Sequence, residues 1–335
     1  MYKIAPIAIF AFNRPAHLRR TLAALAANEL ASESDVTIYC DGPRNLEEQR
    51  LTAATRTVAR EATGFRTCRL VERERNLGLA ESIIRGVSES LVKNDSIIVL
   101  EDDLITSPFF LRYMNEGLDV YADDSRVASI HGWCFPHSVP NPPETFFLRG
   151  ADCWGWGTWK RAWRHFEPNA ALLLRQLREH ELEDVFNCNG AYDYTSMLKA
   201  VQDNKISSWA VRWRASAFLH DLYTLYPGHS LIQNIGMDGS GTHCGATEKL
   251  GVSLAPAPVH VMRQAVQENT AMRQAEMDFL ASLGQRVMPW SRLPFLSNRA
   301  QCKKLCKDFL PPVVWRAAKK LRGKQDSAPG IVWQG

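Results

Sequence analysis

Residues 96–104 read Ser-Ile-Ile-Val-Leu-Glu-Asp-Asp-Leu, a β-branched apolar run that ends in three consecutive carboxylates. The run has the length and composition of a strand that is buried on both faces. Three adjacent carboxylates at the end of such a strand repel one another, so they are costly to bring together unless a cation neutralises them. The pattern therefore predicts a Mg²⁺ or Mn²⁺ site at Glu101, Asp102 and Asp103, shared with substrate phosphates. The alternative is a solvated acidic turn that caps the following helix.

The residues before this run alternate between strand-like and helix-like periodicity. Strands are expected at 6–12, 36–40 and 68–72, and helices after Asn13-Arg14-Pro15, over 46–62 and over 80–93. This alternation predicts an α/β fold, a mostly parallel sheet with helices on both faces. Ligands of such sheets collect where the strands end. Four segments should therefore meet at one edge, namely Asn13–Arg14, Asp41–Arg44, Asn76–Gly78 and Glu101–Asp103.

The composition changes after Phe146, where aromatic residues become frequent. Trp159 and Trp163, four residues apart, are expected on one helix face in the core, whereas Trp-Gly-Trp-Gly at 154–157 is expected to leave its indoles partly open as a platform for sugar rings. Further along, the patterns predict helices over 172–186 and 190–201, a strand flanked by Trp209 and Trp213, and a glycine-rich loop over 234–245.

The glycine-rich loop reads Asn-Ile-Gly-Met-Asp-Gly-Ser-Gly-Thr-His from 234 to 243. Its glycines allow backbone amides to approach a phosphate closely, and Ser240 and Thr242 can donate hydrogen bonds. His243 could ligate a metal or donate to a departing diphosphate. The spacing is neither that of a Walker loop nor that of a dinucleotide fingerprint. A flexible surface loop is the alternative.

Asp193 lies between Tyr192 and Tyr194. An acid in an aromatic pocket can have its pKa raised into the range of a general base. An acid that satisfies the dipole at a helix N-terminus is an equally good interpretation of this residue alone.

Taken together, these motifs resemble a GT-A glycosyltransferase. The opening strand with Phe-Asn-Arg-Pro, then Asp41-Gly42 and Asn76-Leu77-Gly78, resembles the nucleotide-sugar domain of family 2 enzymes. The run from Val99 to Leu104 followed by Ser-Pro-Phe-Phe resembles the Glu-Asp-Asp motif of the N-acetylglucosaminyltransferase I family. The later Trp-Gly-Trp, Tyr-Asp-Tyr and Gly-Ser-Gly-Thr-His segments follow in the same order, over about residues 4–245.

The resemblance implies a role for each matching residue. Asp103 would bind Mn²⁺ that bridges two phosphates, with His243 as a second candidate ligand, and Asp193 would be the catalytic base. The remaining candidates would contact the donor: Asp102 and Glu101 the ribose and sugar, Asp41 the uracil, Arg14 and Asn76 the nucleotide, and Ser240 and Thr242 the diphosphate. Tyr-Asp-Tyr stands where that family has Trp-Asp-Asp-Trp.

The implied activity is an inverting, metal-assisted transfer of a sugar from a UDP-sugar to a hydroxyl of a glycan or lipid-linked glycan, as in polysaccharide or lipopolysaccharide biosynthesis. A metal-dependent phosphohydrolase acting on a nucleotide sugar and a non-catalytic sugar-binding protein are the alternatives. Absence of a membrane anchor, in contrast to the Golgi members of the family, suggests a bacterial cytosolic relative.

Composition fits a soluble globular protein, since the 335 residues are 45% hydrophobic and carry a formal charge of only +4. The eight cysteines form no C-x-x-C pair, which favours reduced thiols in the cytosol. We expect a catalytic domain over 1–255, with a nucleotide-sugar half (1–105) and an acceptor half (106–255), and a helical extension over 256–335.

Charge concentrates in that extension. Residues 286–324 hold eleven Lys/Arg and one acid, a local net of +10. Basic residues over an apolar stripe with Trp315 suit a helix on an anionic membrane surface, so peripheral association with the inner membrane is one interpretation. A solvated helix docked on the body is the other. Basic patches with interleaved aromatics are not found elsewhere, which argues against nucleic acid as a partner.

Overall fold

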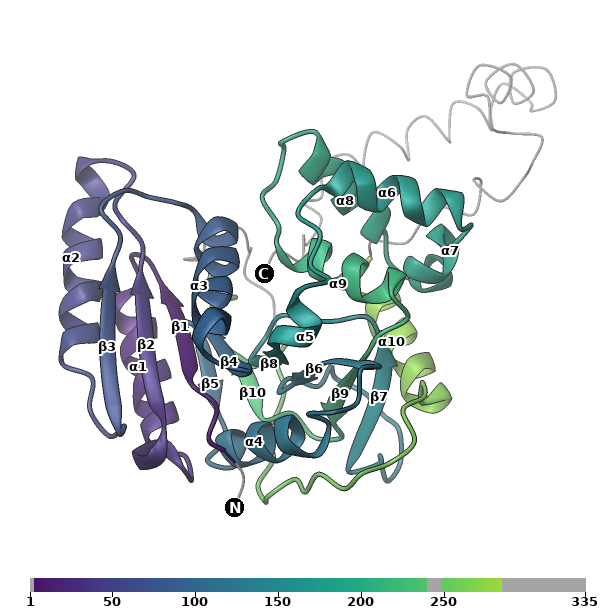
Figure 1. Ribbon diagram of the computed structural model, residues 1–335, viewed down its shortest axis with the longest axis horizontal. Coiled ribbons are helices and arrows are strands. Elements are labelled where there is room, and N and C mark those ends of the chain that lie inside the picture. The colour runs from purple at the N-terminus through teal and green to yellow at the C-terminus, as the bar shows by residue number, and fades with distance from the viewer. Residues whose placement is uncertain (1–2, 240–248, 285–335) are drawn as a thin grey trace, which may run out of the picture.

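The computed structural model describes residues 3–239 and 249–284 (Figure 1). The first elements follow the predicted alternation. They are β1 (Ile7–Ala11), α1 (Pro15–Ala26), a 3-10 turn (Ala31–Glu33), β2 (Asp35–Cys40), α2 (Leu46–Arg60), β3 (Thr67–Glu72), α3 (Leu79–Lys93), β4 (Ser96–Glu101) and β5 (Leu104–Thr106). The later elements are α4 (Phe110–Val120), β6 (Val127–His131), β7 (Thr145–Arg149), β8 (Trp156–Trp159), α5 (Lys160–Trp163), α6 (Ala170–Glu179), α7 (Glu183–Phe186), a second 3-10 turn (Cys188–Gly190), α8 (Tyr194–Gln202), α9 (Ala210–Leu219), β9 (Tyr223–Pro227), β10 (Ile232–Asn234) and α10 (Thr270–Ser282).

One large sheet organises the described residues. Its strand order is β3-β2-β1-β4-β8-β6-β9-β7, and a two-stranded ribbon of β5 and β10 stands beside it. Strands β3, β2, β1 and β4 pair in parallel, whereas β8 and β7 pair only in antiparallel fashion with their neighbours. Strands β6 and β9 pair in parallel with each other. Six of these eight strands therefore run in one direction, which confirms the predicted α/β fold class.

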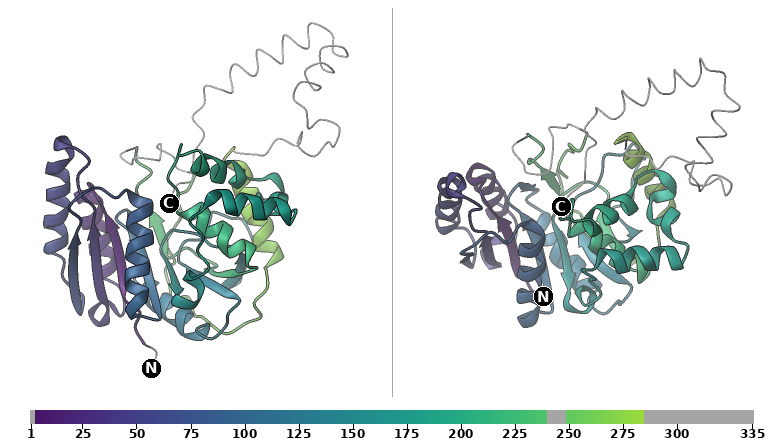
Figure 2. Two further views of the ribbon diagram at one scale, coloured as in Figure 1. Left: turned by 45° about the horizontal axis from the view of Figure 1, so that its top comes forward. Right: turned by 90° about the horizontal axis from the view of Figure 1, so that it is seen from above.

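Helices cover both faces of the parallel half of the sheet. Figures 1 and 2 show α3 on one face and α1 and α2 on the other. All five residues of β1 are buried, as is expected for a strand covered on both sides. Gly86 lets α3 approach closely, because a Cβ at this position would lie 2.5 Å from the ring of Phe10.

The register of the parallel strands aligns their carboxyl ends. Phe10 is opposite Glu101, Ala11 is opposite Cys40, and Cys40 is opposite Glu72. The loops after β1, β2, β3 and β4 consequently leave from one edge. This is the edge at which the sequence places its polar segments.

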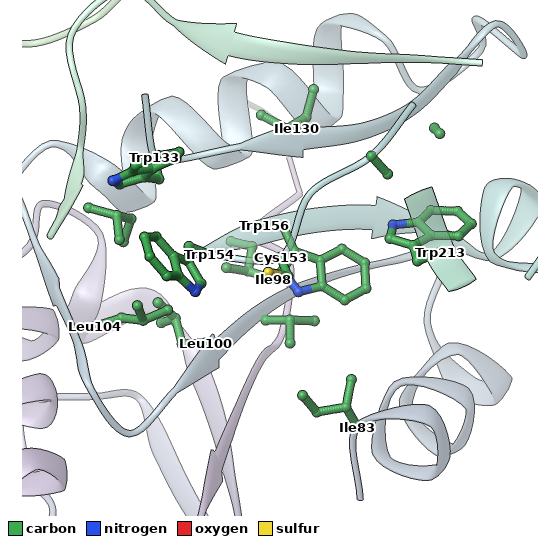
Figure 3. Close-up of a cluster of buried hydrophobic side chains, with 14 of the residues drawn as sticks. Ile83, Ile98, Leu100, Leu104, Ile130, Trp133, Cys153, Trp154, Trp156 and Trp213 are labelled. Atoms are coloured by element: carbon green, nitrogen blue, oxygen red, sulfur yellow. The ribbon is translucent and has the colours of Figure 1, made fainter. Parts of the chain in front are cut away.

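The tryptophans form core and do not line an open platform. Trp154 and Trp156 are buried, with 4% and 0% of their surface exposed. Figure 3 shows Trp133 and Trp154 beside Leu100 and Leu104. The prediction of open indoles is therefore wrong.

The physical reason lies in the glycines of this segment, which admit core side chains. A Cβ at Gly155 would lie 2.6 Å from Ile232 Cδ1, and one at Gly157 would lie 2.9 Å from Met114 Cε. Trp159 is also misplaced by the sequence pattern, because it ends β8 and does not share a helix face with Trp163.

The strand expected between Trp209 and Trp213 is a helix, α9. Both indoles pack against Trp156, with ring centroids 5.2 and 6.3 Å away. This helix is buried on nearly all sides, so its sequence lacks the polar face that would reveal a helical period. Tertiary packing decides its conformation.

Two other helix predictions need smaller corrections. The helix predicted over 172–186 is broken into α6 and α7, because Glu181 takes a left-handed conformation with φ 56°. The cap of α1 is Arg14 instead of Asn13, with Pro15 in the first turn as expected.

Part of the expected C-terminal extension lies within the described residues. Residues 256–269 form no helix or strand and pack on the body, where Gln264 Nε2 donates to Thr145 Oγ1 (3.0 Å) and Glu268 forms an isolated β-bridge with Phe147. Helix α10 follows. The basic run over 286–324 lies outside the described residues.

Candidate active site

The three carboxylates emerge where β4 ends. Glu101 is the last residue of the strand, and Asp102 and Asp103 form the turn that leads into β5. Asp102 is 8% exposed, and its Oδ2 accepts a hydrogen bond from the backbone N–H of Phe12 (3.3 Å). The Thr21 hydroxyl donates to the backbone carbonyl of Asp102 (2.8 Å). The acidic triplet, Glu101–Asp103, is therefore built into the interior and is not a solvated turn.

Two carboxylate oxygens of the acidic triplet are buried without a hydrogen-bond partner in residues 3–239 and 249–284. They are Glu101 Oε1 and Asp103 Oδ1. An unpaired buried carboxylate oxygen is costly, and it indicates a place for a cation or for a donor from a ligand.

Burial and mutual repulsion set the protonation of the triplet. Burial raises the pKa of all three carboxyls, and the charge of Asp103 raises the pKa of Glu101 and of Asp102 further. The pKa of Asp102 is raised to about 7. The Arg14 guanidinium opposes these shifts at each carboxyl. Full ionisation at neutral pH therefore calls for more positive charge than Arg14 supplies.

The donor set fits a hard divalent cation. Carboxylate oxygens are the ligands that Mg²⁺ and Mn²⁺ prefer, commonly one or two from the protein with the rest from substrate phosphates and water. The described residues contain no cluster of three or more His, Cys, Asp or Glu side chains arranged to hold a metal alone. The triplet thus suits a cation that arrives with a phosphorylated substrate.

Arg14 connects the triplet to two residues that the sequence analysis did not single out. Its Nη1 donates to Asp103 Oδ2 (2.8 Å), and its Nη2 lies 3.7 Å from Asp238 Oδ1. His17 Nε2 lies 3.1 Å from Asp238 Oδ2. Arg14 and His17 are three residues apart at the start of α1, a spacing that places them on one side of a helix. This spacing, and the presence of a single acid in the glycine-rich loop, were the sequence features that pointed to His17 and Asp238.

The first part of the glycine-rich loop lies directly on the acidic triplet. Strand β10 pairs with β5, and the Ile235 N–H donates to the backbone carbonyl of Asp103 (2.8 Å). A Cβ at Gly236 would lie 2.0 Å from Asp103 Oδ2 and 2.9 Å from Arg14 Nη1. Only glycine fits here without displacing that ion pair. Ser240, Thr242 and His243 lie outside the described residues.

Asp41 and Asn76 are at the predicted edge, and both tie two loops together. The Asp41 carboxylate accepts hydrogen bonds from the backbone N–H groups of Gly42, Leu77 and Gly78 (2.9–3.1 Å). Asn76 Nδ2 donates to the Gly42 carbonyl (2.8 Å). These contacts hold the two loops together at this edge of the sheet, and a direct contact of either side chain with a base stays a prediction.

A cation–aromatic pair lies beside these loops. The Arg44 guanidinium carbon is 5.2 Å from the centroid of the Phe12 ring, and Glu48 holds Arg44 through an ion pair. The pair joins the turn after β1 to the turn after β2. It provides a flat surface at the same edge as the acidic triplet.

Asp193 caps helix α8. Its carboxylate accepts from the Ser196 N–H (3.0 Å), the Ser196 hydroxyl (2.7 Å) and the Thr195 hydroxyl (3.1 Å). The alternative interpretation of a helix N-terminal acid is therefore correct for this structure. Within the described residues no hydrogen bond joins Asp193 to the acidic triplet, and its role as a base stays a prediction.

A second group of buried charges contacts Tyr194, the residue after Asp193, and the sequence analysis did not find it. The buried charge network consists of Asp152, Arg214, Arg273 and Glu276. Arg214 lies 3.1 Å from Glu276 and 3.5 Å from Asp152, and Arg273 is paired with the second oxygen of Glu276.

The network also supports the neighbour of Asp193. The Arg214 guanidinium carbon stacks 4.3 Å from the Tyr194 ring. Burial alone would raise the pKa of Glu276, but Arg273 and Arg214 outweigh it, and the pKa of this carboxyl is lowered.

Sequence comparison agrees with this geometry. Residues 5–135 match the sequence model of a family described as "Glycosyltransferase like family 2". This part of the chain is similar to family 2 glycosyltransferases. The match contains β1 to β4, the acidic triplet and Arg14, and it confirms the predicted enzyme class, a glycosyltransferase, for this region. No match is found among curated protein sequences.

Distant similarity is also found to solved structures. A mannosyltransferase from Pyrobaculum calidifontis, in complex with GDP-Man and Mn²⁺, is 13% identical over 41% of this chain and 39% of its own, with a TM-score of 0.30. Residues 1–349 of S. aureus TarS are 9% identical over 52% and 49%, with a TM-score of 0.30. Glucosyl-3-phosphoglycerate synthase from Mycobacterium tuberculosis, in complex with Mn²⁺, UDP and glucosyl-3-phosphoglycerate, is 14% identical over 53% and 67%, with a TM-score of 0.33.

The chain thus spans less than half of the first two of these proteins. The large mixed sheet flanked by helices is the architecture predicted from the resemblance to GT-A enzymes. In residues 3–239 and 249–284, no helix combines the length and apolar character needed to cross a bilayer.

Proposed function

We propose that the chain is an inverting glycosyltransferase that takes a sugar from a nucleoside diphosphate donor, with UDP-sugars favoured, and moves it to a hydroxyl acceptor. The observation that carries the proposal is the acidic triplet, buried at the edge where the parallel strands end, with two carboxylate oxygens that have no hydrogen-bond partner among the described residues. It lies inside the region that matches the family 2 model.

In this proposal the donor lies along the carboxyl ends of β1, β2 and β4. The Phe12–Arg44 surface would support the base, and the loops held by Asp41 and Asn76 would frame it. Arg14 would face the diphosphate, because its guanidinium is the cation already held at the triplet. Ser240 and Thr242, by sequence alone, would donate hydrogen bonds to the same phosphates.

Asp103 and Glu101 would hold a divalent cation through their unpaired oxygens, with His243 as a further candidate ligand. When bound, such an ion stabilises negative charge on the diphosphate. The chain's own contribution is to hold these carboxylates together in the interior, and Arg14 adds a positive charge beside them.

The transfer itself needs a base on the acceptor side. Asp193 would take the proton from the acceptor hydroxyl, whose oxygen then forms a bond to the anomeric carbon. The bond from that carbon to the diphosphate oxygen breaks, and its electron pair leaves with the nucleoside diphosphate. The configuration at the anomeric carbon is inverted by this single displacement.

The acceptor is proposed to be a glycan or a lipid-linked glycan. The basic run over 286–324 supports a location at an anionic membrane surface, because each Lys or Arg near such a surface contributes about 1 kcal/mol of binding. Sedimentation with anionic vesicles in low salt tests this part. Equal binding of the full chain and of a chain truncated after Gln285 would contradict it.

The main experiment is a product screen. The purified chain is incubated with UDP- and GDP-sugars, Mn²⁺ and membrane lipid extracts, and products are identified by mass spectrometry. A glycosylated acceptor with inverted anomeric configuration supports the proposal. Free sugar formed equally well without acceptor would indicate a hydrolase, and nucleotide binding without any product would indicate a sugar-binding protein.

Asp103→Asn serves as the inactive variant of this screen, and Asp123→Asn, an exposed aspartate in the turn after α4, is its matched control. Both remove one carboxylate charge. Only the first should abolish product formation.

A further inference from the structure

Arg14 lies between two carboxylates that belong to different parts of the chain. It is 2.8 Å from Asp103 in the acidic triplet and 3.7 Å from Asp238 in the loop after β10. The side chains of Arg14 and Asp103 are 15% and 14% exposed, and that of Asp238 is 48% exposed. Arg14 is thus hydrogen-bonded to the more buried carboxylate, that of Asp103, and lies at a longer ion-pair distance from that of Asp238.

A divalent cation at the triplet would change this balance. It would bind the same carboxylate that Arg14 neutralises, and two positive charges a few ångströms apart repel each other strongly where water is largely excluded. Arg14 would then gain by moving its guanidinium toward Asp238. Among the described residues the Arg14 side chain makes no capping hydrogen bond at the start of α1, so this movement would leave the helix cap unchanged.

Asp238 is held in a position to receive it. His17 Nε2 contacts Asp238 Oδ2 at 3.1 Å, whereas the other oxygen, Oδ1, faces Arg14. His17 and Arg14 both come from the start of α1, so the arrangement needs only a side-chain movement within one cluster. The segment that leads to Asp238 is anchored at the triplet, because Ile235 is hydrogen-bonded to Asp103 and β10 pairs with β5.

We propose that Asp238 is a positioning residue that accepts Arg14 from Asp103 when a divalent cation binds the acidic triplet. It raises the affinity for the cation without being its ligand. The inference rests on the cation of the proposed function and adds a second carboxylate that acts on it only through Arg14.

The test is a double-mutant cycle on metal affinity. Free Mn²⁺ is followed by electron paramagnetic resonance during titration of the full chain, with UDP present and absent, for the wild type, Asp238→Asn, Arg14→Met and the double variant. Asp238→Asn should weaken Mn²⁺ binding about tenfold, and Arg14→Met should strengthen binding in the absence of UDP by a similar factor. In the Arg14→Met background, Asp238→Asn should change the affinity less than about twofold.

Controls separate this role from a general effect of charge or folding. Asp123→Asn removes an equivalent charge at an exposed position and should leave Mn²⁺ affinity unchanged. Arg14→Lys keeps the positive charge and should restore the sensitivity to Asp238→Asn. Circular dichroism and melting curves of each variant establish that the fold is kept.

The inference is overturned by an equal loss of affinity on Asp238→Asn in both backgrounds, since Asp238 would then act directly on the metal. Weaker Mn²⁺ binding by Arg14→Met without UDP would also overturn it. Absence of Mn²⁺ binding to the wild type, even with UDP, would overturn both the inference and the metal-assisted proposal. Metal binding with the predicted coupling but no sugar transfer would contradict the proposed function alone.

Discussion

The acidic triplet and the buried charge network both contain carboxylates in the interior, yet the charges of these carboxylates are compensated to different extents. In the network, Glu276 has an arginine at each oxygen, and Asp152 is paired with Arg214 and accepts a hydrogen bond from Tyr226 (2.7 Å). In the triplet, three carboxylates share one arginine, and two oxygens have no partner among the described residues. A paired network serves the fold, whereas unpaired charge indicates a place for a ligand.

The largest expected effect is on stability, from a substitution in the buried charge network. Arg214→Met would leave Asp152 and Glu276 without their shared partner, so we expect the free energy of unfolding to fall by about 3–5 kcal/mol. Urea denaturation measures it. Arg175→Met is the control, because Arg175 is exposed and its one ion pair among the described residues is with Glu179 on the surface, and it should change stability by less than about 0.5 kcal/mol. A small loss for Arg214→Met would mean that the network is not what holds α9 and α10 together.

A substitution in the acidic triplet should instead lower activity and leave stability nearly unchanged. Asp103→Asn is expected to lower kcat about 100-fold or more, as is typical when an electrostatic stabiliser is lost, with little loss of stability. Product formation at saturating Mn²⁺ and a melting curve measure the two quantities on the same sample. Equal turnover by Asp103→Asn and the wild type would remove the acidic triplet from the reaction.

Gly236 tests how tightly the loop after β10 fits the triplet. Gly236→Ala would place a Cβ 2.0 Å from Asp103 Oδ2, so we expect Mn²⁺ or UDP affinity to fall about tenfold. Calorimetric titration measures the affinity. Gly239→Ala is the control in the same loop: nothing among the described residues lies within 4 Å of its Cβ, and its φ of 84° costs only about 1 kcal/mol of local strain. Equal effects of the two substitutions would show that loop strain, and not the contact with Asp103, is responsible.

The smallest expected effect is a dependence of stability on pH. Burial raises the folded pKa of Asp102 to about 7, above its unfolded value near 4, so the folded chain binds this proton more tightly. Its contribution to stability is therefore present at low pH and is lost as pH rises through about 7.

We expect Asp103→Asn, which removes the repelling neighbour, to be more stable than the wild type at pH 8 by about 1 kcal/mol and to show a smaller difference at pH 5. Melting curves at the two pH values measure this. Mn²⁺ with UDP should give the wild type a similar gain at pH 8. A wild type that becomes more stable relative to the variant between pH 5 and 8 would contradict the assigned direction.

Much of the parallel half of the fold could be predicted from local patterns. The continuous apolar runs of β1 and β4 and the periodicity of α2 and α3 gave elements within one or two residues of those observed. The second half was less predictable, because α9 is buried on nearly all sides and the glycines at 155 and 157 serve packing instead of exposure.

The candidate site likewise contains residues that could be found from the sequence and residues that were missed. The acidic triplet and Arg14 could be found because they follow a strand and precede a helix in the sequence. His17 and Asp238 were missed, because the helical spacing of Arg14 and His17 does not reveal that α1 and the loop after β10 are brought together at Asp103.

Local sequence shows that three carboxylates follow a buried strand, and hence that their charge must be compensated. How far the chain compensates it depends on the tertiary fold, because Arg14 lies about 90 residues before the triplet and Asp238, which contacts Arg14, about 135 residues after it. Local patterns record which side chains a strand end carries. They do not record which distant charges the fold places beside it.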